Sequence, residues 1–373
     1  MSKPIEFVVC TLLAVALVTA PSIAEDWPVY RGNQMATGAV NIALPENLTV
    51  LWKNTLLESG YEGTAVVSEG VVYVGDNDGT LYAYLLSDGS EVWRQTFENS
   101  GFIAGPTFHE GRIYIGDFNG IIRALDASSG KLVWQYEAQG ESYAAPNVVG
   151  EHVLATTEAG ELVSLSVDTG ELQWEFQMEA PLRCWPTVVE GHVLLAGCDE
   201  RVHAIDIATG KEVAGVDIDG PTGATPAVFD GNALFGTEQG SFYAIRVPAM
   251  EIIWRHQDPQ NINPIHTAAA VDSRAAVFGT QGKIFYAIEP GTGKLLWTFP
   301  VRSAVESSPV IVGDSVFLAT KRGVIHRVDI STGKELWSYE AGGNFQAAFA
   351  VAGNRLVIGN TDGTLYCFGT KEK

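Results

Sequence analysis

The sequence predicts an all-β fold, namely an eight-bladed β-propeller of four-stranded antiparallel blades whose ring is closed by an N-terminal strand. Three observations carry this prediction: a tryptophan that recurs about every 40 residues, glycines at fixed offsets, and short apolar runs that alternate with polar residues. A repeat of this length in a strand-rich sequence is typical of propeller blades. A closed ring of repeats can form a single domain even at 373 residues.

Seven of the nine tryptophans share one register, with steps of 41, 41, 40, 80, 43 and 40 residues. The step of 80 spans two repeats, and Ala214 occupies the place of the absent tryptophan. The register therefore has eight positions and predicts eight units. The tryptophans on it are Trp52, Trp93, Trp134, Trp174, Trp254, Trp297 and Trp337.

The second unit shows how one blade is built. Apolar runs at Thr107-Phe108, Arg112 to Ile115 and Ile121 to Leu125, and a fourth that ends at Trp134, are predicted to be strands A to D. Glycines recur 14 and 24 residues after the start of strand A in most units, which indicates turns with positive φ. A four-stranded meander cannot bury both of its faces alone, so neighbouring units must stack.

The last unit begins at Ala347 and ends after its third strand, near Phe368. Residues 47–52, at the other end of the chain, have the pattern of the missing strand D. Pairing this segment with the last blade closes the ring and removes two open sheet edges. The expected divisions are a signal peptide at 1–24, an N-terminal extension at 25–46, the propeller at 47–369 and a C-terminal tail at 370–373.

The first 24 residues have the features of a secretory signal peptide. Lys3 gives a positive start, Phe7 to Ala20 form an apolar core, and Ser22-Ile23-Ala24 is a cleavage site of small residues. The apolar core is short for a membrane span, although an uncleaved anchor is the alternative. We expect cleavage near Ala24, no membrane span after it, and a periplasmic or secreted protein.

The formal net charge of −21 opposes binding to nucleic acids and to anionic membranes, because both require basic patches. Three cysteines remain after the predicted cleavage, which is too few for a fold built on disulfides. The sequence therefore favours a soluble, acidic propeller, and we expect a monomer.

Unit four departs from the repeat, because Glu200 replaces the turn glycine and the unit contains Cys184 and Cys198. Antiparallel counting about the Glu190-Gly191 turn places Cys184 opposite Gly197, one step out of register with Cys198. A disulfide between the two cysteines is one alternative, and two free thiols are the other.

Unit six has Lys283 at the place of the turn glycine and the longest connection between units, residues 255–267. That connection is a candidate for an additional contact surface. The alternative is a surface loop that tolerates changes in length.

The run from Ala124 to Trp134, with the pattern Ala-x-Asp-x-x-Ser/Thr-Gly-Lys-x-x-Trp, resembles the repeat of pyrroloquinoline-quinone-type propellers. Residues 26–32, Asp-Trp-Pro-Val-Tyr-Arg-Gly, are similar to the segment that often precedes such propellers. The resemblance implies that each repeated tryptophan docks on the neighbouring blade. It covers two branches: dehydrogenases that hold the quinone and a calcium ion on the ring axis, and non-catalytic BamB-like propellers that bind proteins.

Polar side chains recur three residues before the start of strand A, where the strands of a propeller converge on its axis. The eight rim positions are Glu62, Ile103, Tyr143, Arg183, Gly223, His266, Glu306 and Gln346. Trp185 lies beside them and could offer a stacking surface. These residues are either a cofactor site with carboxylates, a cation and an amide around one mouth, or a hydrated channel rim, which we favour.

Three features of the sequence oppose the dehydrogenase alternative. The chain has no adjacent Cys-Cys pair, no C-x-x-C-H haem motif, and only short connections between units. We therefore expect an exported, non-catalytic, protein-binding scaffold with a partner in the cell envelope, as in outer-membrane protein assembly. The alternatives are an oxidoreductase that uses pyrroloquinoline quinone and Ca²⁺, and a carbohydrate-binding propeller.

Overall fold

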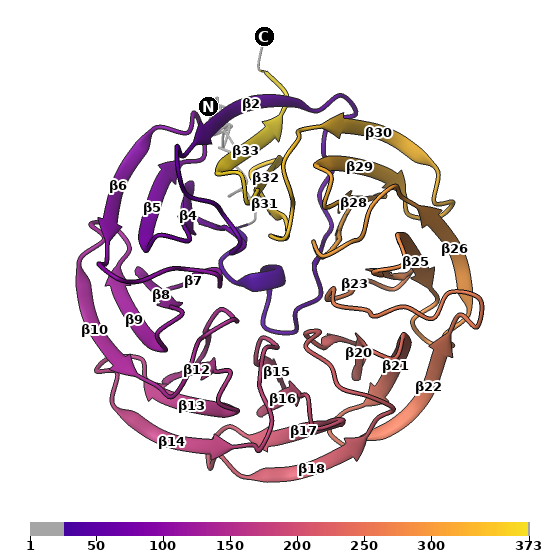
Figure 1. Cartoon of the computed structure of the whole chain (residues 1–373), viewed down its shortest axis with the longest axis horizontal. Helices are drawn as coiled ribbons and strands as arrows, with labels where there is room; N and C mark the ends of the chain where they lie inside the picture. Colours follow the sequence, from indigo (N-terminus) through magenta and orange to yellow (C-terminus); the bar gives the residue numbers. More distant parts are fainter. Residues whose placement is uncertain (1–25, 372–373) are drawn as a thin grey trace, which may run out of the picture.

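Eight antiparallel sheets stand around a central axis in the computed structural model, which describes residues 26–371 (Figure 1). In each sheet the strands follow one another from the axis to the outer wall, and we name these positions A to D. The predicted eight-bladed propeller is confirmed. The signal peptide predicted at residues 1–24 lies outside the described residues.

Seven blades take all four strands from one continuous stretch of chain. From A to D, blade 1 contains β3 (Val66–Ser68), β4 (Val71–Gly75), β5 (Thr80–Leu85) and β6 (Glu91–Thr96), and blade 2 contains β7 (Thr107–His109), β8 (Arg112–Gly116), β9 (Ile121–Asp126) and β10 (Leu132–Glu137). Blade 3 contains β11 (Asn147–Val149), β12 (His152–Thr156), β13 (Glu161–Ser166) and β14 (Leu172–Gln177). Blade 4 contains β15 (Thr187–Val189), β16 (His192–Ala196), β17 (Arg201–Asp206) and β18 (Glu212–Asp217). Blade 5 contains β19 (Ala227–Phe229), β20 (Asn232–Gly236), β21 (Ser241–Arg246) and β22 (Glu251–Gln257). Blade 6 contains β23 (Ala270–Val271), β24 (Ala276–Gly279), β25 (Ile284–Ile288) and β26 (Leu295–Pro300). Blade 7 contains β27 (Val310–Val312), β28 (Ser315–Ala319), β29 (Val324–Asp329) and β30 (Glu335–Glu340).

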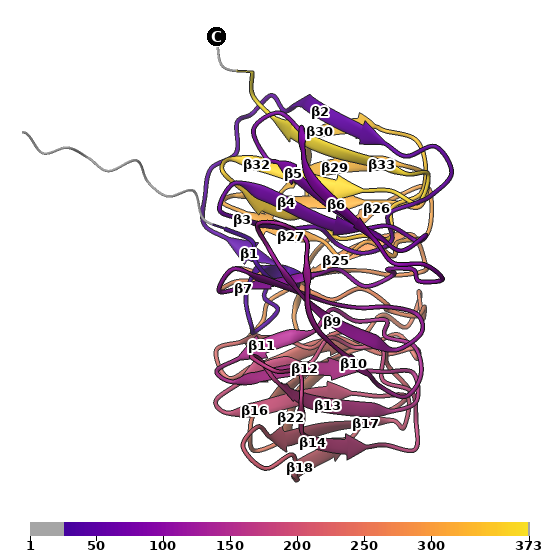
Figure 2. The ribbon, with the colours of Figure 1, turned by 90° about the vertical axis from the view of Figure 1, so that its left-hand side faces the viewer.

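Blade 8 combines the two ends of the chain. Its inner strands are β31 (Ala350–Ala352), β32 (Arg355–Gly359) and β33 (Thr364–Gly369), and its outer strand is β2 (Thr49–Thr55). The antiparallel register pairs Trp52 with Cys367, and β2 and β33 lie side by side in both ring and side views (Figures 1 and 2). The predicted closing strand is confirmed.

The outer strands differ from the prediction in one respect. Strand D of the second unit does not end at Trp134, because β10 continues to Glu137. A shift in register between Leu132 and Trp134 makes a bulge, and the same irregularity recurs in the other blades. Bulges bend a strand and change the direction of its side chains. Trp134 therefore lies near the start of strand D, where it reaches the next blade.

The core lies between blades, and the repeated tryptophan is part of each contact. Trp134 packs with Val153 and Val163 of the next blade, and its indole N–H donates to the carbonyl of Val167 at 3.1 Å. Six of the seven tryptophans on the register make this hydrogen bond to the next blade. The seventh, Trp337, faces the blade in which the chain ends meet, and it packs edge-on against Phe368.

Gly130 shows why glycine follows each docked tryptophan. Its φ is +70°, and a Cβ at this position would lie 2.6 Å from Cε3 of Trp93. We expect Gly130→Ala to lower the free energy of unfolding by about 2–5 kcal/mol, because a left-handed conformation costs about 1–2 kcal/mol and overpacking about 1–3 kcal/mol. Chemical denaturation followed by tryptophan fluorescence measures this loss. Gly111→Ala is the control, since its φ is also positive but no atom lies within 4 Å of the added Cβ.

The blade that lacks the tryptophan is filled from its neighbour. Ala214 pairs with Ala204 as Trp134 pairs with Ala124, so it occupies the tryptophan place. In the next blade Met250 stands where the turn glycine would be, with a φ of 55° and 6% exposure. Met250 belongs to the apolar cluster against which Ala214 packs. At this contact the small residue, Ala214, is therefore in strand D and the large one, Met250, is in the C–D turn of the next blade, which is the reverse of the tryptophan and glycine at the other contacts.

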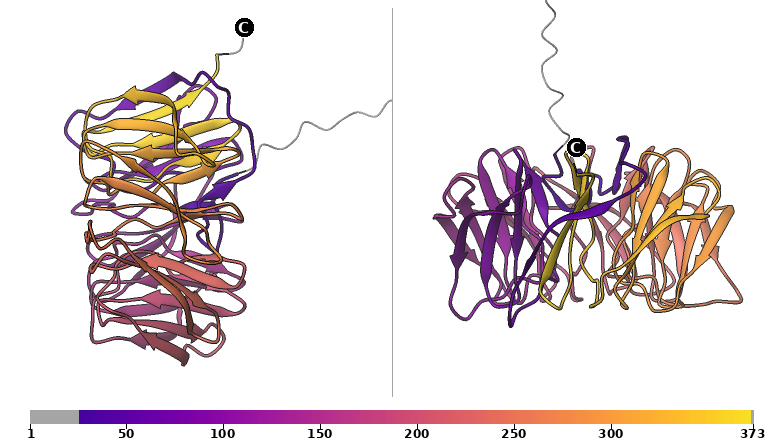
Figure 3. Two further views of the ribbon diagram at one scale, coloured as in Figure 1. Left: turned by 90° about the vertical axis from the view of Figure 1, so that its right-hand side faces the viewer. Right: turned by 90° about the horizontal axis from the view of Figure 1, so that it is seen from above.

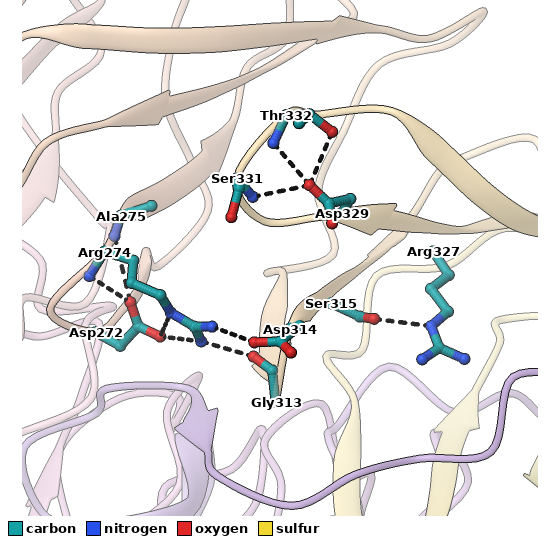
Figure 4. Close-up of polar contacts among 10 residues, drawn as sticks. All are labelled: Asp272, Arg274, Ala275, Gly313, Asp314, Ser315, Arg327, Asp329, Ser331 and Thr332. Atoms are coloured by element: carbon teal, nitrogen blue, oxygen red, sulfur yellow. Dashed lines mark hydrogen bonds and ion pairs between the residues drawn. The ribbon is translucent and has the colours of Figure 1, made fainter.

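Two polar contacts fix turns on the face where strands A and C end (Figure 4). Arg274 donates to Asp272 of its own turn, and across to Asp314 at 2.7 Å and to the Gly313 carbonyl at 2.6 Å. This guanidinium links the A–B turns of blades 6 and 7. In the C–D turn of blade 7, the Asp329 carboxylate accepts hydrogen bonds from the N–H groups of Ser331 and Thr332 and from the Thr332 hydroxyl.

The C–D turn aspartates predict how stability depends on acidity. Hydroxyl and N–H donors lower the pKa values of Asp126, Asp206 and Asp329 below the ordinary 3.8. Because the folded pKa is the lower one, this stabilisation is complete above the unfolded pKa and is lost as pH falls through the folded pKa. We expect the melting temperature to drop below about pH 4. The variant with all three aspartates changed to asparagine should lose less in circular-dichroism melts, and an equal loss would contradict this assignment.

The N-terminal extension lines the inside of the ring, and we call residues 26–41 the strap. It contains the 3₁₀ turn η1 (Tyr30–Gly32) at the centre of the ring and β1 (Ala39–Val40), which pairs parallel with β27 (Figure 1). Its carbonyls accept hydrogen bonds from six of the blades in turn. In blades 1, 2, 4, 5, 6 and 7 the donor is the backbone N–H of the second residue of strand A, namely Val67, Phe108, Val188, Val228, Val271 and Ile311. Viewed edge-on, the strap enters from one face and leaves towards β2 (Figure 3).

Candidate functional site

The eight rim positions line one cavity on the axis, which we call the cup. Its volume is about 170 Å³. The floor is formed by Tyr30 of the strap, by Trp185, and by the hydroxyl residues Thr64, Thr225 and Ser308. The strap fills the channel beneath the floor, so the cup opens on the face where strand A begins.

Alternation explains why these positions converge. In extended backbone, successive side chains point in opposite directions. The residue before each rim position is buried between blades, as Tyr61, Phe102 and Phe345 show, and the rim residue therefore points to the axis. The repeat places this pattern around the ring, so the sequence alone predicts the position of the cup but not its chemistry.

A second ring surrounds the rim and was missed in the sequence analysis. Each of its members follows a rim position by 15 residues, in the B–C turn: Asn77, Phe118, Glu158, Cys198, Glu238, Gln281, Lys321 and Thr361. Each member also donates its backbone N–H to the connection that precedes a rim residue. The constant offset of 15 residues is present in the sequence, but of these positions only Cys198 is considered in the sequence analysis, as a possible disulfide partner.

The second ring pairs with the polar rim residues. Asn77 donates to Glu62 at 2.9 Å, and Lys321 lies 2.8 Å from Glu306. His266 contacts Glu238 at 3.0 Å on one ring nitrogen and Gln281 at 3.1 Å on the other. These contacts within the protein fix the positions of the polar rim side chains.

Arg183 is the most connected rim residue. Its guanidinium pairs with Glu158 of the preceding blade, which raises the pKa of Arg183, and lies 5.6 Å from the ring centroid of Tyr143. The Tyr143 hydroxyl donates to Glu141 at 2.6 Å, and this hydrogen bond raises the pKa of Tyr143. Arginine and tyrosine therefore remain a cation and a neutral phenol at neutral pH.

Trp185 does not offer the stacking surface considered for it. It lies in the floor rather than on the rim, it is 1% exposed, and its ring packs against Tyr30 with the centroids 6.0 Å apart. The backbone turns Trp185 inwards because its N–H donates to the Thr225 hydroxyl of the next blade. Its indole N–H has no hydrogen-bond partner in the part of the chain that the structure describes.

The disulfide considered for unit four is not formed in the structure. Cys184 and Cys198 are both free thiols, as is Cys367. Cys184 is buried and its sulfur accepts the Ala196 N–H at 3.4 Å, whereas Cys198 belongs to the second ring. Burial raises the pKa of Cys184 to about 11 and also raises that of Cys198, so neither thiol is activated.

The connection in unit six is held against its own blades. Asp258 accepts the Tyr286 hydroxyl at 3.0 Å and the Gln260 N–H at 2.9 Å, and Asn263 packs closely on Gly240. The cup receives only His266 from the end of this segment. The connection therefore supports the rim as much as it offers a separate surface.

The dehydrogenase alternative requires a quinone and a calcium ion in the cup. Within residues 26–371, no group of three or more His, Cys, Asp and Glu side chains is placed to hold a metal ion. The two rim carboxylates already accept from Asn77 and Lys321, and the Trp185 ring packs against Tyr30, so it offers no face for a quinone to stack on. The cup is also smaller than the ~300–1,000 Å³ typical of pockets for drug-sized ligands. These residues do not fit the quinone and its calcium.

The fold and the cup define an eight-bladed propeller of the PQQ-like repeat class whose channel is closed from one side. The chain belongs to the family described as outer membrane protein assembly factor BamB, whose model matches residues 36–184 and 168–372. A search of curated proteins finds no match. Within the described residues, no helix has the length and apolar character that crossing a membrane requires.

Solved structures of both branches share the fold. BamB from Moraxella catarrhalis is 19% identical with a TM-score of 0.74, over 87% of this chain and 100% of that one. A quinohemoprotein alcohol dehydrogenase from Comamonas testosteroni is 15% identical with a TM-score of 0.80, over 93% and 81%. A europium-containing methanol dehydrogenase is 14% identical with a TM-score of 0.77, over 93% and 98%. At these identities the likeness shows the fold alone.

Proposed function

We propose that this protein is a non-catalytic binding scaffold of the cell envelope, periplasmic or secreted, that contacts a partner protein through the face on which the cup opens. Membership of the BamB family supports a role in the assembly of outer-membrane proteins. The rim and second ring would present a rigid polar surface to the partner, because their positions are fixed by the blades.

The pairing of the rim with the second ring carries this proposal. Glu306, Arg183 and His266 each have a charged or polar partner within the protein. A catalytic or cofactor site would need such groups free to contact a ligand. Polar groups that are already hydrogen-bonded within the protein suit a protein interface, because an unpaired charge buried by the partner would weaken binding. The pattern of charges on such a surface selects the partner.

Photo-cross-linking tests the scaffold and the face together. A photoreactive residue at Phe118, in the B–C turn of blade 2, reports on the cup face, and one at Glu110, in the A–B turn of the same blade, reports on the opposite face. Both positions are exposed. We expect one envelope protein to be captured from position 118 and not from position 110, and depletion of this chain to lower the level of folded outer-membrane barrels.

Two results would contradict the proposal. Capture from neither position, with unchanged outer-membrane proteins after depletion, would oppose a scaffold in assembly. Binding of pyrroloquinoline quinone with Ca²⁺ in calorimetry, together with dye reduction in the presence of alcohols, would favour the oxidoreductase. Saturable binding of oligosaccharides with no protein cross-link would favour a carbohydrate-binding propeller.

A further inference from the structure

A buried positive charge lies next to the floor of the cup. Arg31 is 1% exposed, and within the described residues only Nη2 of its three side-chain nitrogens has a partner, the Ala269 carbonyl at 2.9 Å. Tyr30, the residue before it, and Ala268, the residue before its partner, both line the cup. Burial lowers the pKa of Arg31 to about 10, so the guanidinium remains charged at neutral pH.

Among residues 26–371 this charge has no carboxylate partner, and an unpaired buried charge is physically costly. A buried ion without a counterion is strongly destabilising, and each unpaired donor adds its own desolvation cost. The other buried arginine of the ring, Arg123, pairs with Asp117 at 2.7 Å. The strap therefore carries an uncompensated cation into the centre of a protein that is otherwise strongly acidic.

The floor above this charge is rich in unpaired donors. The Trp185 indole N–H has no partner. The hydroxyls of Thr64, Thr225 and Ser308 accept backbone N–H groups from Ala348, Trp185 and Ala268, respectively, at about 3 Å. A hydroxyl that accepts such a bond still has its own proton to donate. All four side chains are at least nine-tenths buried.

The walls of the cup hold two balanced ion pairs, and the carboxylates of Glu62, Glu141 and Glu238 at its mouth have amide, phenol or histidine partners. Glu306 is balanced by Lys321, and Arg183 by Glu158. His266 faces Glu238 and Gln281, and Tyr143 faces Glu141. Glu62 is the one acidic rim residue whose contact, Asn77, is uncharged. These carboxylates lie at the mouth of the cup, whereas the hydroxyl donors and the neighbouring Arg31 charge lie at its base.

We propose that the cup binds a carboxylate group, with the carboxylate oxygens at the floor. Donors converging on a small site select an acceptor, and the uncompensated guanidinium selects an anion. A metal cation would be repelled by the same charge. The volume of about 170 Å³ suits one side chain or a small acid. If the scaffold function holds, the carboxylate is an acidic side chain or chain end of the partner protein.

Two variants separate binding from folding. Trp185→Phe removes the unpaired N–H but keeps an aromatic ring, so its melting temperature without ligand should be unchanged or slightly higher. Loss of a hydrogen bond to a charged acceptor should weaken carboxylate binding about tenfold or more. Glu62→Gln removes the unbalanced negative charge on the rim, so binding should tighten several-fold.

The probe is sodium acetate, and sodium chloride at equal ionic strength is the control. Binding of each salt to the full chain is measured by calorimetry and by thermal shift. We expect acetate alone to bind and to raise the melting temperature with concentration. No difference between the two salts would overturn the proposal, as would an unchanged acetate response in Trp185→Phe. Phosphate binding in place of acetate would overturn the choice of carboxylate.

A further arm identifies the source of the carboxylate. A short peptide with blocked ends and one glutamate is compared with the same peptide carrying glutamine, and with free acetate. Binding of the glutamate peptide assigns the cup to a partner's side chain, whereas binding of acetate alone assigns it to a free small acid and opposes the link to a partner. The cross-linking experiment is independent, so the scaffold function and the carboxylate site can fail separately.

Discussion

Asp117→Ala is expected to lower the free energy of unfolding by about 3–5 kcal/mol, because it leaves the buried cation of Arg123 without a counterion. The two side chains are 0% and 5% exposed, and they lie 2.7 Å apart in blade 2. The Arg123 guanidinium also lies 4.3 Å from the centroid of the Phe97 ring and donates to the Ile121 carbonyl at 3.4 Å. The ring cannot replace a counterion.

Asp117 also organises the turn between β8 and β9. Its carboxylate accepts the N–H groups of Asn119 and Ile121 at 2.9 Å and the Ser100 hydroxyl at 2.6 Å. These donors would be left unsatisfied in the variant, which adds to the loss. Urea denaturation at neutral pH measures the effect.

Asp76→Ala is the matched control for this prediction. Asp76 holds the equivalent turn of blade 1, with two N–H groups and the Tyr82 hydroxyl as donors, but no cation. Its removal should cost about 1–3 kcal/mol, the price of unsatisfied donors alone. Adding Arg123→Met to Asp117→Ala should restore part of the stability, since the unpaired cation is gone. Equal losses for the two aspartates, or no restoration, would contradict the role of the ion pair.

The repeat made the ring predictable, and departures from the repeat limited what could be predicted. The tryptophan register and the incomplete last unit were sufficient to place the closing strand at β2. The strap was not predictable, because Trp27 and Arg31 occur once and no period marks them. Their burial depends on carbonyls that meet one N–H from each of six blades, which is a tertiary pattern.

The site was predictable in position but not in chemistry. The offset of three residues located the rim, since alternation along extended backbone turns those side chains to the axis. The pairing of Glu306 with Lys321, and of Arg183 with Glu158, depends on turns that approach from the same blade in one case and from the neighbouring blade in the other. No local sequence pattern distinguishes a partner in the same blade from a partner in the neighbouring blade.

Ala214 and Met250 yield the second large expected effect, as a double-mutant cycle. Ala214→Trp alone should lower the free energy of unfolding by about 1–3 kcal/mol or more, because Met250 fills the place that the indole needs. Met250→Gly alone should cost about 2–5 kcal/mol for the cavity, less the relief of a positive φ of 55°. The double variant should be more stable than either single variant.

The physical reason is that the double variant rebuilds the contact found at the other blades. A glycine in the C–D turn would leave room for the indole, as Gly210 does for Trp174, and the new N–H could donate to the Val247 carbonyl as Trp174 donates to Ile207. Residues in direct contact couple by about 0.5–3 kcal/mol, and we expect a value near the upper end in urea denaturation. Additive losses would show that Met250 does not fill the tryptophan place. Met178→Gly, a buried methionine outside this contact, should show no coupling to Ala214→Trp.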